Sequence, residues 1–268
     1  MAGQPAQRPR ARHVHIGGEG CFTYQLVPAL RQAFDHFNNH QTKYRKDPAS
    51  VLQPLDQVML CRTAIDTLLV HCVQSTGQRG RDLRVVGDKT PQHAVSLALL
   101  AQVYPDGRFI HIIRDPRDAA VSGYFHQGKE SGKSLEEFAA HFIGTVWPLH
   151  VANARTAGAA LGDRYLELRY EDLHRDAATL TRRMLGHIGV AADDEHVRRC
   201  VERGSFEAVT GGRSRGSEDR ANFFRKGVVG DWRTHLTPDV AQRLCAPVAD
   251  LMRACGYDPG AADAAAAA

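Results

Sequence analysis

The chain has 268 residues, a formal net charge of +4, and ordinary contents of hydrophobic (43%) and charged (24%) residues, which suit one large globular α/β domain or two small ones. The charge excess is small and no basic run is interleaved with aromatic residues, so we expect no nucleic acid partner. No apolar run approaches the roughly 20 residues of a membrane span. No apolar stretch follows the N-terminal arginines, as it would in a secretory signal. We therefore expect a cytoplasmic protein.

The six cysteines show neither a C-x-x-C motif nor a regular spacing. This pattern predicts buried free thiols of a reducing compartment, not a disulfide framework. The cysteines are Cys21, Cys61, Cys72, Cys200, Cys245 and Cys255.

The N-terminal segment contains the first candidate site. Residues 1–11 are polar and contain prolines, which indicates a loose tail. A short strand over 13–16 leads into a glycine-rich loop over 17–23, and a helical pattern follows. Strand, glycine-rich loop and helix in this order are the form of a phosphate-binding element.

The next segment is less regular. Residues 35–54 are polar and aromatic, and we expect a long loop or a small subdomain there. A helix is predicted over 55–73 and a short strand over 84–89. Thr90 then caps a further helix with Pro91 at its first position.

The central stretch carries the clearest signal. β-Branched and aromatic residues over 109–113 predict a buried strand. Asp115 as a cap and Pro116 at the first helical position predict that a helix starts directly afterwards. Arg114 therefore lies at the carboxyl end of a strand, with Ser122 about two turns along the helix. In open α/β sheets ligands bind at this place, and a guanidinium, a hydroxyl and a helix N-terminus suit a phosphate.

The second half alternates in the same way. A capping box over 134–137 opens a helix, and residues 165–168 form a fourth predicted strand. Residues 204–220 are rich in Gly, Ser and Arg, which indicates a flexible loop. Further helices are expected around 176–188, around 193–203, and from Pro238 to Gly256.

Four strands alternating with helices predict a three-layer α/β/α fold around a central parallel sheet. We expect a single domain over residues 1–268, with residues 260–268 as a low-complexity tail.

Other patterns are weak. Gly-Lys-Ser at 132–134 looks like the end of a P-loop, but Gln127 stands where that motif needs a glycine. Two histidine pairs have the spacing of metal ligands, but no further ligand converges with them in a known zinc pattern, so we expect no metal. These pairs are His13 with His15 and His36 with His40.

A third phosphate-binding pattern is Arg225-Lys226-Gly227, which joins two cations to a glycine that lets the backbone approach a ligand. With the glycine-rich loop and the Arg114–Ser122 segment, it resembles the sulfotransferases that use 3′-phosphoadenosine 5′-phosphosulfate (PAPS). The motifs that carry the resemblance are Gly-Asp-Lys-Thr-Pro (87–91), Arg-Asp-Pro-Arg-Asp-Ala-Ala-Val-Ser (114–122), Leu-Arg-Tyr-Glu-Asp-Leu (168–173) and Arg-Lys-Gly-Val-Val-Gly-Asp-Trp-Arg-Thr-His-Leu-Thr (225–237).

The resemblance covers nearly the whole chain after residue 80, and Gly-Asp-Lys-Thr-Pro is common in bacterial and carbohydrate-type members. It implies a P-loop-NTPase-like sulfotransferase fold, PAPS as donor and 3′-phosphoadenosine 5′-phosphate (PAP) as product, without a metal. It also implies the residues that bind the nucleotide. Arg114 and Ser122 match those that bind the 3′-phosphate, Arg225, Lys226 and Gly227 match those that close over it, and Tyr170 matches a tyrosine near the adenine.

The first loop departs from the family pattern, which reads close to Pro-Lys-Ser-Gly-Thr-Thr around the 5′-phosphosulfate. Gly18 stands where the family has a lysine or arginine, and a glutamate follows it. Backbone N–H groups of the loop at Gly18 and Gly20 are then expected to cradle the phosphate, with Cys21 and Thr23 nearby. Three alternatives stay open: another cation replaces the lysine, the chain is a catalytically impaired PAPS- or PAP-binding homologue, or it is a P-loop-like small-molecule kinase.

The resemblance implies transfer of a sulfonyl group from PAPS to a hydroxyl or amine of a sugar or small-molecule acceptor. Lys89 matches a lysine near the transferred group and is the predicted stabilising cation; the alternative is an ion pair with Asp88. His93 is the leading candidate for the general base, because related enzymes place a histidine just after the matching Lys-Thr. The competing bases are Glu19, Asp35, His36 and His40.

Overall fold

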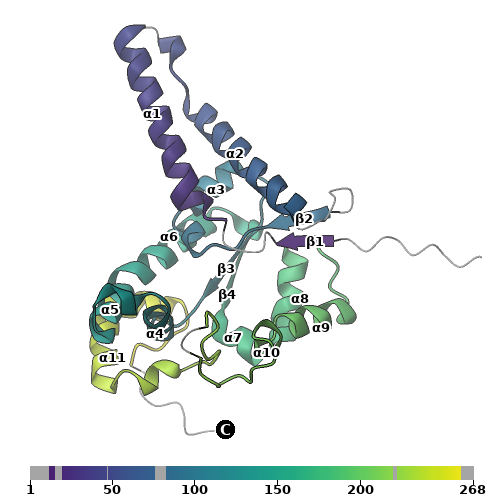
Figure 1. The fold of residues 1–268 in the computed structure, drawn as a ribbon, viewed down its shortest axis with the longest axis vertical. Helices are drawn as coiled ribbons and strands as arrows, with labels where there is room; N and C mark the ends of the chain where they lie inside the picture. The colour runs from purple at the N-terminus through teal and green to yellow at the C-terminus, as the bar shows by residue number, and fades with distance from the viewer. Residues whose placement is uncertain (1–11, 16–19, 47, 76–82, 220–221, 261–268) are drawn as a thin grey trace, which may run out of the picture. The chain divides into compact units, whose positions relative to one another are not determined.

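The computed structural model describes residues 12–15, 20–46, 48–75, 83–219 and 222–260 (Figure 1). The chain divides into two compact units, Met1–Gly107 and Arg108–Ala268. Among the described residues, each unit contains one pair of hydrogen-bonded strands. The predicted tails over 1–11 and 260–268 lie outside the described residues, except for Gly260.

The first unit pairs β1 (Arg12–His15) with β2 (Leu83–Gly87) in parallel, as the sequence predicted. His15 lies opposite Gly87 at the carboxyl ends of the two strands. Parallel strands end at the same edge of their sheet. The residues that follow β1 and β2 therefore start from one edge.

The helix after the glycine-rich loop is longer than the sequence predicted. It begins with a π-helical turn over Phe22–Leu26 and continues as α1 (Val27–Tyr44), which runs beside α2 (Pro54–Ser75) (Figure 1). The expectation of a long loop or subdomain over 35–54 is therefore wrong. Residues 29–46 contain neither Gly nor Pro, so nothing in their sequence ends the helix.

The helix expected to start at Thr90 is interrupted. Pro91–Ala94 form a 3-10 turn, and α3 (Leu97–Val103) begins only after Ser96. The apolar faces of the helices then enclose the core of this unit. Its buried members are Phe22, Val27, Cys61, Ile65 and Val103.

The second unit is built on β3 (Phe109–Ile113), which has the predicted bounds and pairs in parallel with β4 (Tyr165–Arg169). The register places Ile113 opposite Arg169. The residues that follow, Arg114 and Tyr170, therefore leave the same edge of the strand pair, where ligands of α/β proteins bind.

Helices cover both sides of this strand pair (Figure 1). On one side lie α4 (Pro116–His126), α5 (Leu135–His141), α6 (Trp147–Ala159) and α11 (Pro238–Cys245). On the other side lie α7 (Tyr170–Arg175), α8 (Ala177–His187), α9 (Asp194–Arg203) and α10 (Phe206–Val209).

The core of the second unit lies among α4, α5, α6 and the C-terminal helices. The last predicted helix is divided into α11, a 3-10 turn over Ala246–Val248, and α12 (Ala249–Ala254), and Gly256 ends it in a left-handed conformation with φ +77°. The fully buried side chains include Ile143, Cys245 and Met252.

All six cysteines lie in the described part of the chain and are free thiols. Cys61, Cys245 and Cys255 are buried as predicted, whereas the other three are half-buried. Within the described ranges, no helix combines the length and the apolar character that crossing a membrane requires.

Candidate functional site

The turn between β3 and α4 confirms the predicted helix start. Asp115 caps α4 by accepting a hydrogen bond from the backbone N–H of Arg117 at 2.9 Å, and Pro116 follows the cap. The guanidinium of Arg117 binds the same carboxylate at 2.7 Å. This buried pair fixes the first turn of the helix, and with it the backbone next to Arg114.

Arg114 connects the strand end to a distant loop. Its Nη2 donates a hydrogen bond to the carbonyl of Val228 at 3.2 Å. Its guanidinium lies over the ring of Tyr170 at 4.6 Å, and its own carbonyl accepts from the indole N–H of Trp147 at 3.0 Å. The Nε of Arg114 is buried and has no acceptor among the described residues.

Asp118, in the first turn of α4, holds the same loop. Its two carboxylate oxygens accept hydrogen bonds from the backbone N–H groups of Gly230 at 2.6 Å and Trp232 at 2.9 Å. Burial raises the pKa of Asp118, while the charge of Arg114 and these two N–H groups work in the opposite direction. Ser122 is half-buried one turn further along, and residues four apart share a helix face. Its role at a phosphate stays a prediction.

The two cations of the Arg-Lys-Gly pattern share one carboxylate. Asp231 pairs with Arg225, accepts from Nζ of Lys226 at 2.6 Å and lies 3.2 Å from His235. Burial opposes ionisation, but the hydrogen bonds from Lys226 and Arg225 lower the pKa of Asp231 to about 2. Arg225 also pairs with Glu218 at 2.5 Å.

Gly227 occupies a position that only glycine fits. Its φ is +66°, in the left-handed region. A Cβ at this position would lie 2.3 Å from the ring of Phe206. Phe206 itself is buried at the start of α10. The backbone at Gly227 thus packs directly against an aromatic ring.

The segment over 213–219 is bound to the Arg-Lys-Gly segment. The guanidinium of Arg213 donates to the carbonyls of Phe224 and Arg225. The backbone N–H of Gly216 donates to the carbonyl of Lys226 at 2.9 Å. Part of the loop that the sequence marked as flexible thus forms a hydrogen-bonded strip beside the cations.

The first unit holds the other predicted residues. Gly18 and the competing base Glu19 lie outside the described residues. The backbone N–H of Gly20 donates to Oδ1 of Asp88 at 2.9 Å, and that of Cys21 reaches Oγ1 of Thr90 at 3.5 Å. Cys21 has a positive φ of 55°. The described N–H groups of the loop are thus directed at the segment that follows β2.

Asp88 organises this second cluster. Its Oδ2 accepts from the hydroxyl of Thr90 at 2.9 Å and lies 2.5 Å from Nε2 of His93. The Nδ1 of His93 is 3.0 Å from the hydroxyl of Thr23. Burial works against the charge of Asp88, but bonds from His93, Gly20 and Thr90 lower its pKa. The carboxylate, the imidazole and the hydroxyl thus form a connected row.

Lys89, the predicted cation, is exposed directly after Asp88. The three competing bases that the structure describes lie on the exposed surface of α1. These are Asp35, His36 and His40. Within the described ranges, no three His, Cys, Asp or Glu side chains are grouped as metal ligands.

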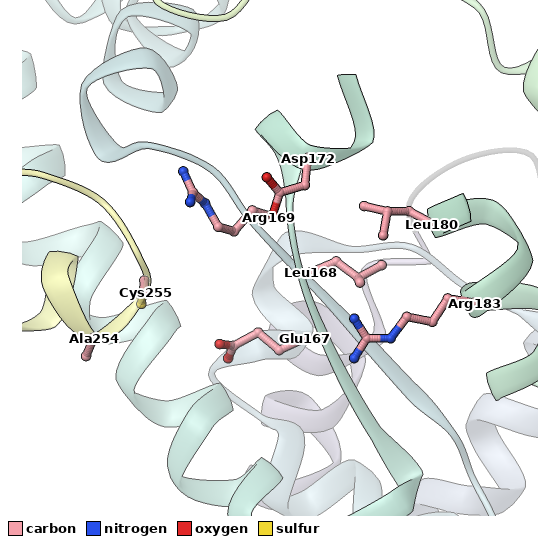
Figure 2. Close-up of a pocket in the computed structure, with 8 residues that line it drawn as sticks. All are labelled: Glu167, Leu168, Arg169, Asp172, Leu180, Arg183, Ala254 and Cys255. Atoms are coloured by element: carbon pink, nitrogen blue, oxygen red, sulfur yellow. The ribbon is translucent and has the colours of Figure 1, made fainter. Parts of the chain in front are cut away.

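A pocket of about 180 Å³ opens on another part of the second unit (Figure 2). None of the predicted site residues lines it, and ligand pockets usually measure about 300–1,000 Å³. We therefore do not assign the nucleotide to it. Its lining comes from β4, the start of α7, α8 and the end of α12: Glu167, Leu168, Arg169, Asp172, Leu180, Arg183, Ala254 and Cys255.

The sequence predicted that Arg114 and the Arg-Lys-Gly segment act at one site, but it did not indicate the carboxylates that hold both. The signal for Asp118 was its position in a first helical turn. Asp88 and Asp231 had only their places within the quoted motifs, and Asp88 was considered only as a partner of Lys89. The partners of each carboxylate include residues that the fold alone brings near, such as Gly20 for Asp88 and Gly230 for Asp118.

Comparison with known proteins gives a consistent result. The profile of the sulfotransferase family matches residues 6–194. The 3-beta-hydroxysteroid sulfotransferase of Cavia porcellus is 25% identical over 196 residues, which cover 67% of this chain and 66% of that protein. Cytosolic sulfotransferase 17 of Arabidopsis thaliana is 27% identical over 175 residues, covering 56% and 51%. The chain thus spans about two thirds or less of the length of these relatives.

One solved structure supports the fold. Mouse sulfotransferase SULT7A1, complexed with PAP, matches with a TM-score of 0.51 and 21% identity over 69% of this chain and 70% of that one. At this identity the likeness concerns the fold alone. It confirms the predicted fold class, an α/β fold of the sulfotransferase type that is mostly helical with a small amount of parallel sheet.

Proposed function

Because the chain belongs to the sulfotransferase family, we propose that it transfers a sulfonyl group from PAPS to a hydroxyl or amine of a small-molecule or sugar acceptor. The observation that carries the proposal is the bond between Arg114 and Val228, whose residues are 114 positions apart. This bond joins the two motifs that, by their resemblance to the family, are expected to bind the 3′-phosphate.

The residues of the second unit suit a phosphate. The Nε atoms of Arg114 and Arg225 are buried and lack acceptors among the described residues, and phosphate oxygens are strong acceptors for guanidinium groups. Lys226 adds a third cation, and the half-buried Gly227 follows it directly. A bound 3′-phosphate would compete with Asp231 for the two cations of this segment.

The first unit suits proton transfer. PAPS supplies the sulfonyl group, with charge developing on the bridging oxygen as the bond to it breaks. We assign to Lys89 the role of stabilising this negative charge. The ionised carboxylate of Asp88 accepts from Nε2–H of His93, which leaves the lone pair on Nδ1. His93 is then oriented as a base, and the hydroxyl of Thr23 occupies the position from which Nδ1 takes a proton.

The glycine-rich loop is assigned to the 5′-phosphosulfate. In this proposal Gly18, Gly20, Cys21 and Thr23 hold it through backbone N–H groups and a hydroxyl. Gly20 and Cys21 now donate to Asp88 and Thr90, so cofactor binding exchanges those bonds. No lysine of the loop contributes, because Gly18 stands at that position.

The proposal also covers the acceptor, the cellular location and the domain organisation. The Cavia porcellus relative is named for a 3-beta-hydroxysteroid, which supports a small molecule with a hydroxyl group. The Gly-Asp-Lys-Thr-Pro motif supports a carbohydrate-type acceptor of the kind found in bacterial members. A cytoplasmic location and a single domain are proposed on the sequence evidence given above.

Calorimetry with PAP in metal-free buffer tests the proposal, with AMP as the control ligand and Arg114→Ala as the control protein. We expect micromolar binding that needs the 3′-phosphate and that the substitution weakens about 100-fold, since a lost charge-assisted contact costs about 1.5–3 kcal/mol. Equal binding of PAP and AMP would contradict the proposal. PAP binding without turnover of PAPS would identify an impaired homologue, and magnesium-dependent ATP binding a kinase.

A further inference from the structure

A histidine beside the Tyr170 ring and an arginine bound to that histidine lie outside the motifs that support the proposed function. His174, near the end of α7, accepts a hydrogen bond at Nδ1 from Nη1 of Arg215 at 2.5 Å. The rings of Tyr170 and His174 lie 4.5 Å apart, and Arg114 stacks over the same Tyr170 ring at 4.6 Å. Three separate segments thus meet here: Arg114 stacks on the Tyr170 ring, His174 packs beside that ring, and Arg215 binds His174.

Arg215 also belongs to the strip that is bound to the Arg-Lys-Gly segment. The next residue, Gly216, donates its backbone N–H to the carbonyl of Lys226 at 2.9 Å. The backbone of Arg215 is therefore fixed next to Gly216, which is hydrogen-bonded to Lys226, a predicted 3′-phosphate cation. The side chain is exposed, so it can turn from His174 to a ligand without disturbing the core.

The charges around His174 are positive. After burial, Arg215 and Arg114 are the groups that lower the pKa of His174, to about 4. The carboxylates that act on the two arginines are Glu207, which accepts from the backbone N–H of Arg215 at 3.4 Å, and Asp118, which attracts Arg114. A neutral imidazole that accepts from one guanidinium, with a second guanidinium over the neighbouring Tyr170 ring, is an arrangement that an anion would stabilise.

We propose that Arg215 and His174 bind the 3′-phosphate together with Arg114, and that His174 takes up one proton from solvent as the nucleotide binds. This inference rests on the proposed function and adds two residues to its site. In the free protein Nδ1 of His174 is an acceptor for Arg215. In the complex Arg215 donates to the phosphate, and the protonated Nδ1 becomes a donor to it.

The sign of the pH effect follows from this exchange. A dianionic phosphate favours the charged imidazole and raises its pKa in the complex above that in the free protein. Binding therefore takes up protons in the pH range between the two values, and the affinity for PAP rises as the pH falls. AMP, which lacks the 3′-phosphate, does not produce this effect.

The test is calorimetry of PAP and AMP at about pH 6, where a histidine close to a phosphate titrates, in two buffers of different ionisation enthalpy. Arg215→Gln should weaken PAP about 10- to 100-fold, as expected for a lost charge-assisted bond, and should affect AMP less. His174→Gln keeps an acceptor for Arg215 but cannot take up a proton, so its proton uptake should disappear. Arg253→Gln, which removes an exposed pair with Asp250, is the matched control.

Full PAP affinity in Arg215→Gln, or unchanged proton uptake in His174→Gln, would overturn the inference while leaving the proposed function intact. If the unmodified protein does not bind PAP, the proposed function fails, and NMR titration of His174 decides the inference by itself. Inorganic phosphate should raise the titration midpoint of His174 relative to chloride at equal ionic strength. An unchanged midpoint would mean that this cluster does not bind phosphate.

Discussion

The carboxylate of Asp118 accepts a hydrogen bond from the backbone N–H of Trp232 at 2.9 Å, although the two residues are 114 positions apart. Asp118→Ala leaves this N–H and that of Gly230 without their acceptor. Because an unsatisfied buried group costs about 1–3 kcal/mol, the free energy of unfolding should fall by about 2–4 kcal/mol. Urea denaturation measures the change. Asp239→Ala, which removes an exposed first-turn carboxylate of α11, should have little effect, and equal losses in both variants would contradict the assignment.

Gly227→Ala tests the close approach to Phe206. An alanine in the left-handed region costs about 1 kcal/mol, and forcing a methyl group against the ring adds about 1–3 kcal/mol. Gly211→Ala is the matched control, because its φ is +72° and nothing lies within 4 Å of the added Cβ. Thermal unfolding should show a clearly larger loss for Gly227→Ala, together with weaker PAP binding. Equal losses would mean that the ring moves aside.

Asp231 should make stability depend on pH. Its pKa is lowered from 3.8 to about 2, so its contribution is complete above about pH 4 and disappears as the pH falls toward 2. The shift corresponds to about 2 kcal/mol. Asp231→Asn should therefore lose stability at neutral pH and approach the unmodified protein near pH 2, as measured by urea denaturation at a series of pH values. The exposed Asp250→Asn should follow the unmodified protein throughout, and a pH-independent difference for Asp231→Asn would contradict the assignment.

His93→Ala should retain PAP binding and lose turnover if His93 is the general base. Steady-state assays with PAPS and a panel of hydroxyl acceptors measure turnover, and calorimetry measures binding. His36→Ala and His40→Ala, which remove two competing candidate bases on α1, should keep full turnover and serve as the comparison. Full turnover in His93→Ala, or loss of turnover in either control, would remove His93 from this role.

The cysteines should divide into two reactivity classes. Burial raises the pKa of Cys245 to about 11 and also raises the pKa values of Cys61 and Cys255. An aromatic disulfide reagent at about pH 8 should therefore modify the three half-buried thiols in the folded protein and all six after denaturation. PAP should slow the reaction at Cys21, which lies in the proposed phosphosulfate loop. Six equally fast thiols in the folded protein would contradict the burial pattern.

Local signals in the sequence were sufficient for several elements. The bounds of β3 followed from its β-branched run, and the cap at Asp115 with Pro116 located the start of α4. The capping box of Ser134 and Glu137 is present as predicted, with the N–H of Glu137 donating to the Ser134 hydroxyl at 3.2 Å. Each of these features depends on residues within a few positions of one another.

Where the prediction failed, the deciding contacts were distant or the polarity was misleading. The second half of α1 is polar and exposed, so its composition resembled a loop although no residue there breaks a helix. The long-range bonds of Asp88 and Asp118 could not be predicted, because a carboxylate in a sequence gives no sign of which distant N–H groups the fold will bring to it. The predicted roles of Ser122 and Lys89 stay predictions.

The strip over 213–219 has a consequence for how members of such a family can diverge. Arg213 and Gly216 fasten this strip to the carbonyls of Arg225 and Lys226. An insertion or exchange there would shift the cations on the neighbouring segment as well. A chimera that aims at a new acceptor should therefore transplant residues 205–232 as one block.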